Sequence, residues 1–236
     1  MGGFGESITE VMKLFLSGDK ALFEVIFLSL KVSLSATAIG MLIGIPFGTF
    51  MGMYRFPGRQ LLIVAIYTLM GLPPVLAGVL IYLLLSGNGP FGQWQLLFTP
   101  TAMIIAQTLL ATPIITGLTM VAIRGKEKVY LETAVSMGAN RFQTAWMIIR
   151  EAKLGIMAAV VTAFGRAIAE VGAVMLVGGN IEHSTRVMTT SIILETRKGN
   201  FNLALGLGLI LMVISFLVNG FLVTGVLQYL QRGEQN

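Results

Sequence analysis

The fold is decided by one polar stretch between long apolar runs, Arg124-Gly-Lys-Glu-Lys-Val-Tyr-Leu-Glu-Thr-Ala-Val-Ser-Met-Gly-Ala-Asn-Arg-Phe-Gln-Thr-Ala-Trp-Met-Ile-Ile-Arg-Glu-Ala-Lys153. It carries six basic side chains, whereas no charged residue occurs between Arg59 and Arg124 or between Lys198 and Arg232. A hydrocarbon layer about 30 Å thick is crossed by ~20 apolar residues in a helix, so the first charge-free run holds two spans and the second holds one. The polar stretch is therefore predicted to be a loop between membrane spans, where a soluble partner can bind.

The overall composition extends this prediction to the rest of the chain. Hydrophobic residues make up 55% of the 236 residues and charged residues 11%. Because unpaired peptide groups are costly in hydrocarbon, the spans must be helices that close their own hydrogen bonds. We expect an all-α polytopic membrane protein with an exterior amphipathic segment at 1–21, retained in the protein, and a transmembrane domain at 22–236. The five expected spans are Leu22–Tyr54, Leu61–Leu85, Pro100–Ile123, Leu154–Gly178 and Phe201–Leu230.

The distribution of basic residues predicts the orientation. If residues 124–153 are cytoplasmic, nine basic residues face inward, namely Arg55, Arg59, Arg124, Lys126, Lys128, Arg141, Arg150, Lys153 and Arg232. Five then face outward, namely Lys13, Lys20, Arg186, Arg197 and Lys198. Cytoplasmic loops carry the excess of Lys and Arg, so we expect the N-terminus outside and the C-terminus in the cytoplasm.

The polar loop has the pattern of two short amphipathic helices. Apolar residues at helical spacing before Gly138 form the first, and this glycine can take the left-handed conformation that ends a helix. Asn140 is a suitable N-cap for the second, in which Phe142, Ala145, Trp146 and Ile149 form one stripe. Such a helix can lie on lipid headgroups or fill a groove in another protein.

Glycines and prolines indicate how the spans pack and where they break. Small residues recur every fourth position at Gly40, Gly44, Gly48 and Gly52, which favours close packing of another helix of the same chain over a dimer contact. Pro73 and Pro74 in the second span, and Thr112 with Pro113 in the third, are candidate pathway or hinge positions, with simple kinks as the alternative.

Two ionisable residues are expected deep in the fourth span, Arg166 and Glu170. Their four-residue spacing lets them meet on one helix face, so we expect an internal salt bridge. In the alternative interpretation, Arg166 attracts an anion electrostatically.

Several kinds of chemistry have no motif in this sequence. The only Gly-Lys pair, Gly125-Lys126, is followed by Glu127, so the chain has no phosphate-binding loop and is not expected to hydrolyse ATP. With no cysteine and the lone His183, a metal site is not expected. No nucleophile with a base is visible for an intramembrane enzyme, and an ion-driven secondary transporter would need inverted repeats and more deep carboxylates.

The loop resembles the cytoplasmic EAA loop of ABC importer permeases, E-A-A-x3-G-x9-I-x-L-P. The matching positions are Glu132, Thr133, Ala134, Gly138 and Ile148. Thr133 replaces the first Ala of the pattern, and Arg150-Glu151 replaces its Leu-Pro.

The resemblance extends to Gly71-Leu-Pro-Pro-Val-Leu-Ala-Gly78, to residues 164–181 and to Thr185-Arg-Val-Met-Thr-Thr190, which are similar to the tungstate branch of the molybdate, sulfate and tungstate permeases. It implies a permease fold of the molybdate and methionine type in the cell membrane of a prokaryote, surrounded by lipid. It also implies a second copy of the chain, two cytoplasmic ATPase subunits that bind ATP and Mg, and an external oxyanion-binding protein. No cofactor of its own and no nucleic acid are expected. Tungstate, molybdate and sulfate all remain open as substrates.

Overall fold

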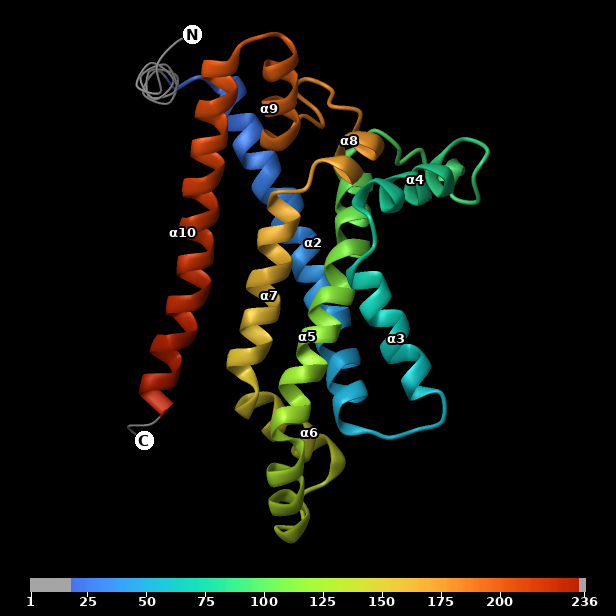
Figure 1. Cartoon of the computed structure of the whole chain (residues 1–236), viewed down its shortest axis with the longest axis vertical. Helices are drawn as coiled ribbons and strands as arrows, with labels where there is room; N and C mark the ends of the chain where they lie inside the picture. Colours follow the sequence, from blue (N-terminus) through green and yellow to red (C-terminus); the bar gives the residue numbers. More distant parts are fainter. Residues whose placement is uncertain (1–17, 234–236) are drawn as a thin grey trace. The chain divides into compact units, whose positions relative to one another are not determined.

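The structure is a computed structural model that describes residues 18–233, without the side chains of 127–129, 131, 132, 135 and 225–233. Residues 1–17 of the expected exterior segment lie outside this range. The described chain is helical (Figure 1). Its elements are α2 (Lys20–Met53), α3 (Arg59–Met70), α4 (Pro74–Leu85), the 3-10 turn η1 (Gly92–Trp94), α5 (Pro100–Ser136), α6 (Arg141–Glu151), α7 (Lys153–Ile168), α8 (Gly172–Gly178), α9 (Met188–Arg197) and α10 (Phe201–Gly233).

Apolar helices of membrane-spanning length account for most of this structure. Three are long and apolar enough to cross a bilayer, over Lys20–Met53, Pro100–Lys126 and Phe201–Thr224. Two broken pairs, α3 with α4 and α7 with α8, bring the number to five if each pair counts as one span. The predicted all-α fold with about five spans is confirmed.

The structure corrects three details of the expected helices. The span expected at Leu61–Leu85 breaks after Met70, where Pro73 and Pro74 cannot donate to the preceding turn. The span expected at Leu154–Gly178 breaks at residues 169–171. In contrast, α5 continues through Pro113 to Ser136, so Thr112 does not mark a break and the first half of the polar loop is not a separate helix.

The chain forms two compact units, each made of several sequence segments. Of the described residues, the first unit contains 18–36, 73–107 and 167–218, and the second contains 37–72, 108–166 and 219–233. Helices α2, α5, α7 and α10 contribute residues to both units.

In the first unit, α4 packs against α8 (Figure 1). The contact is close because a Cβ on Gly78 would lie 2.8 Å from the Ala173 Cα. The backbone N–H of Phe98, just before α5, donates to the Val177 carbonyl at 2.8 Å. This bond ties the start of α5 to the α4–α8 pair.

In the second unit, the glycine stripe of α2 lies against α5. A Cβ on Gly48 would lie 2.6 Å from the Thr116 carbonyl oxygen, and one on Gly52 would lie 2.6 Å from Ile123 Cγ2. The prediction that these glycines allow packing within the chain is confirmed. The turn from α2 to α3 is closed by the Arg59 guanidinium, which donates to the Met51 carbonyl at 2.6 Å from Nη2 and at 3.0 Å from Nε.

Candidate functional site

The polar loop is a helical hairpin in the second unit, made of the end of α5 and of α6 (Figure 1). Gly138 has φ +72°, the left-handed conformation predicted for it. The Ala139 N–H donates to the Ala134 carbonyl at 3.0 Å, which is the long bond of a Schellman motif. The first helix therefore ends at a glycine-dependent turn.

Asn140 begins α6, as predicted. Its side-chain oxygen accepts from the Gln143 N–H at 2.9 Å, and the Gln143 side chain accepts from the Asn140 N–H at 2.9 Å. This reciprocal capping box satisfies two of the N–H groups that a helix start leaves unpaired. The glycine turn and the capping box together fix the direction in which α6 leaves α5.

One face of α6 is buried against the rest of the second unit. Ile148 is fully buried in a cluster with Ile123 and Ala152, and Ala145 and Ile149 pack against this cluster. The Tyr130 hydroxyl donates to Glu151 Oε2 at 3.0 Å, and this bond to the carboxylate raises the pKa of Tyr130. Only Ala152 separates α6 from α7, so the loop is joined stiffly to the following helix.

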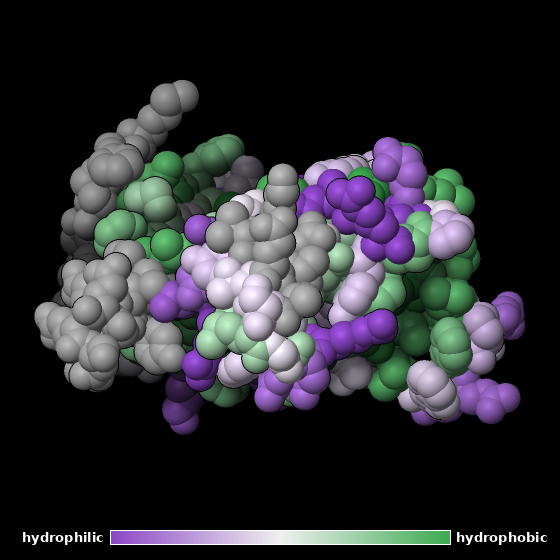
Figure 2. Space-filling model, turned by 90° about the horizontal axis from the view of Figure 1, so that it is seen from below, coloured by the Kyte–Doolittle hydropathy of each residue, from purple (hydrophilic) through white to green (hydrophobic). Residues whose placement is uncertain are grey.

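The opposite side of the hairpin exposes apolar side chains. Exposed fractions are 80% for Met137, 82% for Phe142 and 54% for Trp146, and the Arg150 guanidinium lies 5.4 Å from the Trp146 ring centroid. We call these four residues the coupling surface. The predicted stripe is thus divided, because Phe142 and Trp146 face outward whereas Ala145 and Ile149 face the core. Figure 2, seen from below, shows hydrophilic residues around the centre of the view, and hydrophobic residues mixed with further hydrophilic ones towards its right side.

The EAA-like positions divide in the same way. Ala134 and Ile148 are buried, Thr133 is exposed, and Gly138 forms the turn. The backbone of Glu132 lies in α5, but its side chain is outside the part that the structure describes. The motif residues with described side chains therefore mostly support the hairpin, and the coupling surface lies beside them.

The proposed pathway residues lie in different settings. Pro73 caps α4 and Pro74 is its first residue, so they occupy the break that the sequence suggested. The half-buried Thr112 donates its hydroxyl proton to the Thr108 carbonyl within α5 at 2.8 Å. Neither observation identifies a bound molecule, and the pathway assignment stays a prediction.

The geometry behind the predicted Arg166–Glu170 pair differs from expectation. Arg166 lies on α7 in the second unit with an exposed side chain. Glu170 follows the end of α7, in the first unit, is 8% exposed and accepts from the Ala173 N–H at 3.2 Å. Since α7 ends at Ile168, a four-residue spacing is no longer one helical turn.

Sequence reasoning missed a buried polar cluster in the first unit. Gln107 and Thr189 are 4% and 6% exposed, and they bond the carbonyls of Ala167 and Glu170 at 2.9 Å. Ser29 accepts from the Met188 N–H at 2.8 Å. The sequence signal that could have revealed this cluster is the presence of polar side chains within apolar helices.

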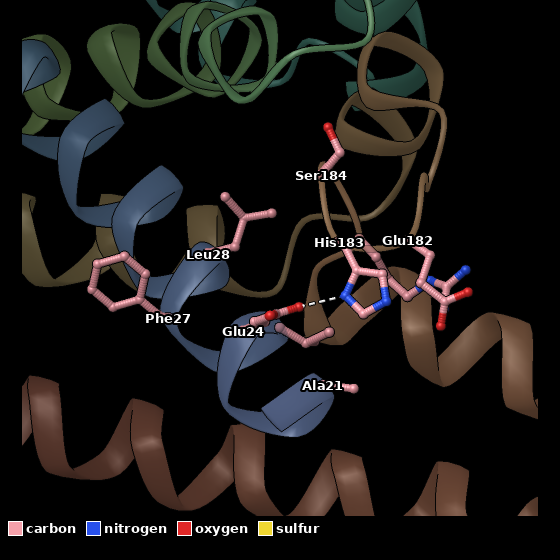
Figure 3. A pocket seen from close by; sticks show the side chains of 9 residues that line it. Ala21, Glu24, Phe27, Leu28, Glu182, His183 and Ser184 are labelled. Atoms are coloured by element: carbon pink, nitrogen blue, oxygen red, sulfur yellow. Dashed lines mark hydrogen bonds and ion pairs between the residues drawn. The ribbon is translucent and has the colours of Figure 1, made fainter. Parts of the chain in front are cut away.

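A second missed feature is a pocket of about 200 Å³ at the surface of the first unit (Figure 3). His183 Nδ1 lies 2.7 Å from Glu24 Oε2 across it. The bond to Glu24 raises the pKa of His183 above its ordinary value. His183 has φ +58°, a conformation that is uncommon for a residue with a side chain.

The described apolar helices, two pairs of which are broken spans, and the polar hairpin define the class of protein, a multi-pass membrane protein. The same fold occurs in the crystal structure of an amino acid ABC transporter with histidines, at a TM-score of 0.59 and 19% identity, covering 92% of this chain and 96% of that one. The chain belongs to the family of binding-protein-dependent transport system inner membrane components, whose profile matches residues 44–234.

Relatives in this family are similar along most of their length. The tungstate uptake system permease protein TupB of Peptoclostridium acidaminophilum is 44% identical over 91% of this chain and 94% of its own. A probable anion ABC transporter permease protein of Haloferax volcanii is 40% identical over 81% of this chain and 84% of its own. The prediction of a multi-pass ABC permease related to tungstate permeases is confirmed.

Proposed function

We propose that the chain is the translocation subunit of an ATP-driven importer of tungstate. The observation that carries this proposal is the 44% identity to a tungstate permease over 91% of the chain. Molybdate and sulfate remain the alternatives, because all three are tetrahedral dianions and an external binding protein can discriminate among them.

Energy reaches the permease through the coupling surface. Met137, Phe142 and Trp146 present exposed aromatic and apolar side chains on a hairpin with a buried opposite face. Aromatic residues and Met are enriched at the cores of protein interfaces, and Arg150 beside Trp146 adds a cationic partner. A cytoplasmic ATPase that binds ATP and Mg can bind to this surface, with one ATPase on each of two permease copies.

The supports of the hairpin favour transmission of force over independent motion. α6 and α7 are separated by one residue, Ala152. Its N–H donates to the Ile148 carbonyl at 2.8 Å, and its carbonyl accepts from the Ile156 N–H at 3.0 Å, so helical hydrogen bonding continues across the junction. ATP-driven closure of the ATPases would therefore move α6 and α7 together. Alternating access follows when this movement shifts the balance between two states of the paired permeases.

Substrate identity is tested by uptake of labelled tungstate into vesicles that carry the permease, its ATPase and its binding protein. Tungstate uptake that needs ATP and resists a hundredfold excess of sulfate is the expected result. If molybdate or sulfate is taken up faster than tungstate, that anion is the substrate instead. Uptake without ATP would contradict the assignment to ATP-driven importers.

Docking is tested separately by ATPase co-purification. Phe142→Ala with Trp146→Ala should reduce the retained ATPase at least tenfold, since truncating central interface aromatics costs about 2 kcal/mol or more each. Phe201→Ala is the matched control, because Phe201 is 66% exposed at the start of α10 and lies in the first unit. Equal retention in the double variant and the control would contradict the docking assignment.

A further inference from the structure

The break between α7 and α8 borders a small cavity in the first unit. Its volume is about 10 Å³, and its polar lining residues are Ser29, Ser33, Gln107, Glu170 and Thr189. About one water-sized particle fits such a volume. A tetrahedral oxyanion with four oxygens is larger than this volume.

Three polar residues of the lining donate hydrogen bonds to backbone carbonyls. Ser29 donates its hydroxyl proton to the Val25 carbonyl at 2.7 Å, and Thr189 donates its own to the Glu170 carbonyl at 2.9 Å. Gln107 Nε2 donates to the Ala167 carbonyl at 2.9 Å. That carbonyl can only accept, so the orientation of the Gln107 amide is fixed and its oxygen is directed elsewhere.

Gln107 Oε1 is the acceptor that most needs an occupant. The side chain is 4% exposed, and this oxygen has no hydrogen-bond partner among the described residues. A buried acceptor without a partner costs about 1–3 kcal/mol. An occupant that donates a hydrogen bond or carries positive charge would remove this cost.

The cavity also contains one acidic side chain. Glu170 is its only charged lining residue and is 8% exposed. The described ion pairs are His183–Glu24, Arg186–Glu182 and Lys198–Glu195, and Glu170 is in none of them. A buried carboxylate is retained in proteins when a cation or strong hydrogen bonds compensate it.

Partial negative charge on the backbone around the cavity would also favour a cation. Ile168, the last residue of α7, also lines the cavity, and the carbonyl end of a helix carries partial negative charge. In broken membrane helices, unwound backbone and the C-terminal ends of half-helices are the places where small cations are held.

We propose that this cavity is a binding site for one Na⁺ ion, held by the Glu170 carboxylate and Gln107 Oε1 with the hydroxyl oxygens of Ser29 and Thr189. The ion joins α5 to the α7–α8 break and to α9 within the first unit. Its role is structural, and the site is independent of which oxyanion the permease carries.

Thermal unfolding of the purified full-length chain in detergent tests the proposal. The measurement compares NaCl, KCl and choline chloride at one ionic strength. Na⁺ should raise the unfolding temperature by about 2–8 °C in a saturable manner, because ligand binding to the folded state alone stabilises it. Glu170→Gln and Gln107→Leu should each remove this Na⁺-dependent rise, whereas Glu182→Gln, at an exposed carboxylate, should keep it.

Two outcomes would overturn the site. One is an unfolding temperature of the unchanged protein that is equal in Na⁺ and choline, which would mean a water molecule or a protonated Glu170 fills the cavity. The other is a Na⁺-dependent rise that persists in Glu170→Gln. If the variants do not fold, equilibrium binding of radioactive Na⁺ to the unchanged chain decides, with no stoichiometric uptake counting against the proposal.

Discussion

Gly138 has φ +72°, and among the described residues no heavy atom lies within 4 Å of the position that a Cβ would take. A side chain there meets open space, so any damage must come from the backbone conformation. A β-branched residue disfavours the left-handed conformation by about 1–2 kcal/mol. The glycine requirement at this turn is therefore conformational rather than steric.

The first prediction follows from that distinction. Gly138→Val should tilt α6 relative to α5, lower ATPase co-purification several-fold and reduce uptake, while membrane insertion stays normal. Gly125→Val is the matched control, because Gly125 also has open space around it but is helical and without positive φ. Normal ATPase retention and uptake in Gly138→Val would contradict the role of the turn.

His183 gives a pH prediction. Glu24 raises its pKa, so the stabilising pair is fully present below the unfolded-state pKa of about 6.5 and is lost as pH rises through the higher folded-state pKa. The unfolding temperature should therefore fall between pH 6 and pH 9 by more in the unchanged protein than in His183→Gln. Because the chain has a single histidine, NMR can titrate its ring directly. Identical pH dependence in both proteins would rule out this contribution.

Arg166 gives a third prediction. A charged side chain at membrane depth faces water or protein rather than lipid, and Arg166 is exposed within its own chain. If Arg166 attracts the transported anion, Arg166→Ala should lower uptake about tenfold or more. The unfolding temperature should change by less than about 2 °C, as for substitutions of exposed residues. Loss of stability that is restored by adding Glu170→Ala would instead support a structural salt bridge between the two residues.

At the scale of elements, the packing of α2 on α5 depends on glycine. Gly48→Ala should destabilise the protein by about 1–3 kcal/mol, because its Cβ would lie 2.6 Å from the Thr116 carbonyl oxygen. Gly208→Ala on α10, where no heavy atom of the described residues lies within 4 Å of the Cβ position, should be neutral or slightly stabilising. Thermal unfolding of both variants checks the prediction, and equal unfolding temperatures would contradict it.

Elements with local signals were predictable from the sequence. The left-handed Gly138, the Asn140 cap and the break before Pro74 were recognised because glycine, asparagine and proline act on their own backbone. The α7–α8 break was not, since Ala169-Glu170-Val171 contains neither Gly nor Pro.

Hydrogen bonds from residues distant in the sequence stabilise the α7–α8 break. Gln107 bonds the Ala167 carbonyl across 60 residues, and Thr189 bonds the Glu170 carbonyl across 19. A window of local sequence contains none of these partners. The buried polar cluster and the break were missed together for this one reason.

At the scale of the whole molecule, the charge distribution predicts that the polar hairpin is cytoplasmic and the α8–α9 loop external. The chain has no cysteine, so single cysteines can be introduced without background labelling. His183→Cys should react with a membrane-impermeant thiol reagent added outside intact cells, and Met137→Cys should react only after the cells are opened. The opposite pattern would reverse the orientation.

The length of α5 has a consequence for how the permease can be held. The apolar run of α5 ends at Ile123, and residues 124–136 continue the helix by about 20 Å. Lipid headgroups occupy only about 5–8 Å on each side of a bilayer. If the apolar run lies in the hydrocarbon, the end of α5 extends beyond the headgroups, where the proposed ATPase could bind it without displacing lipid.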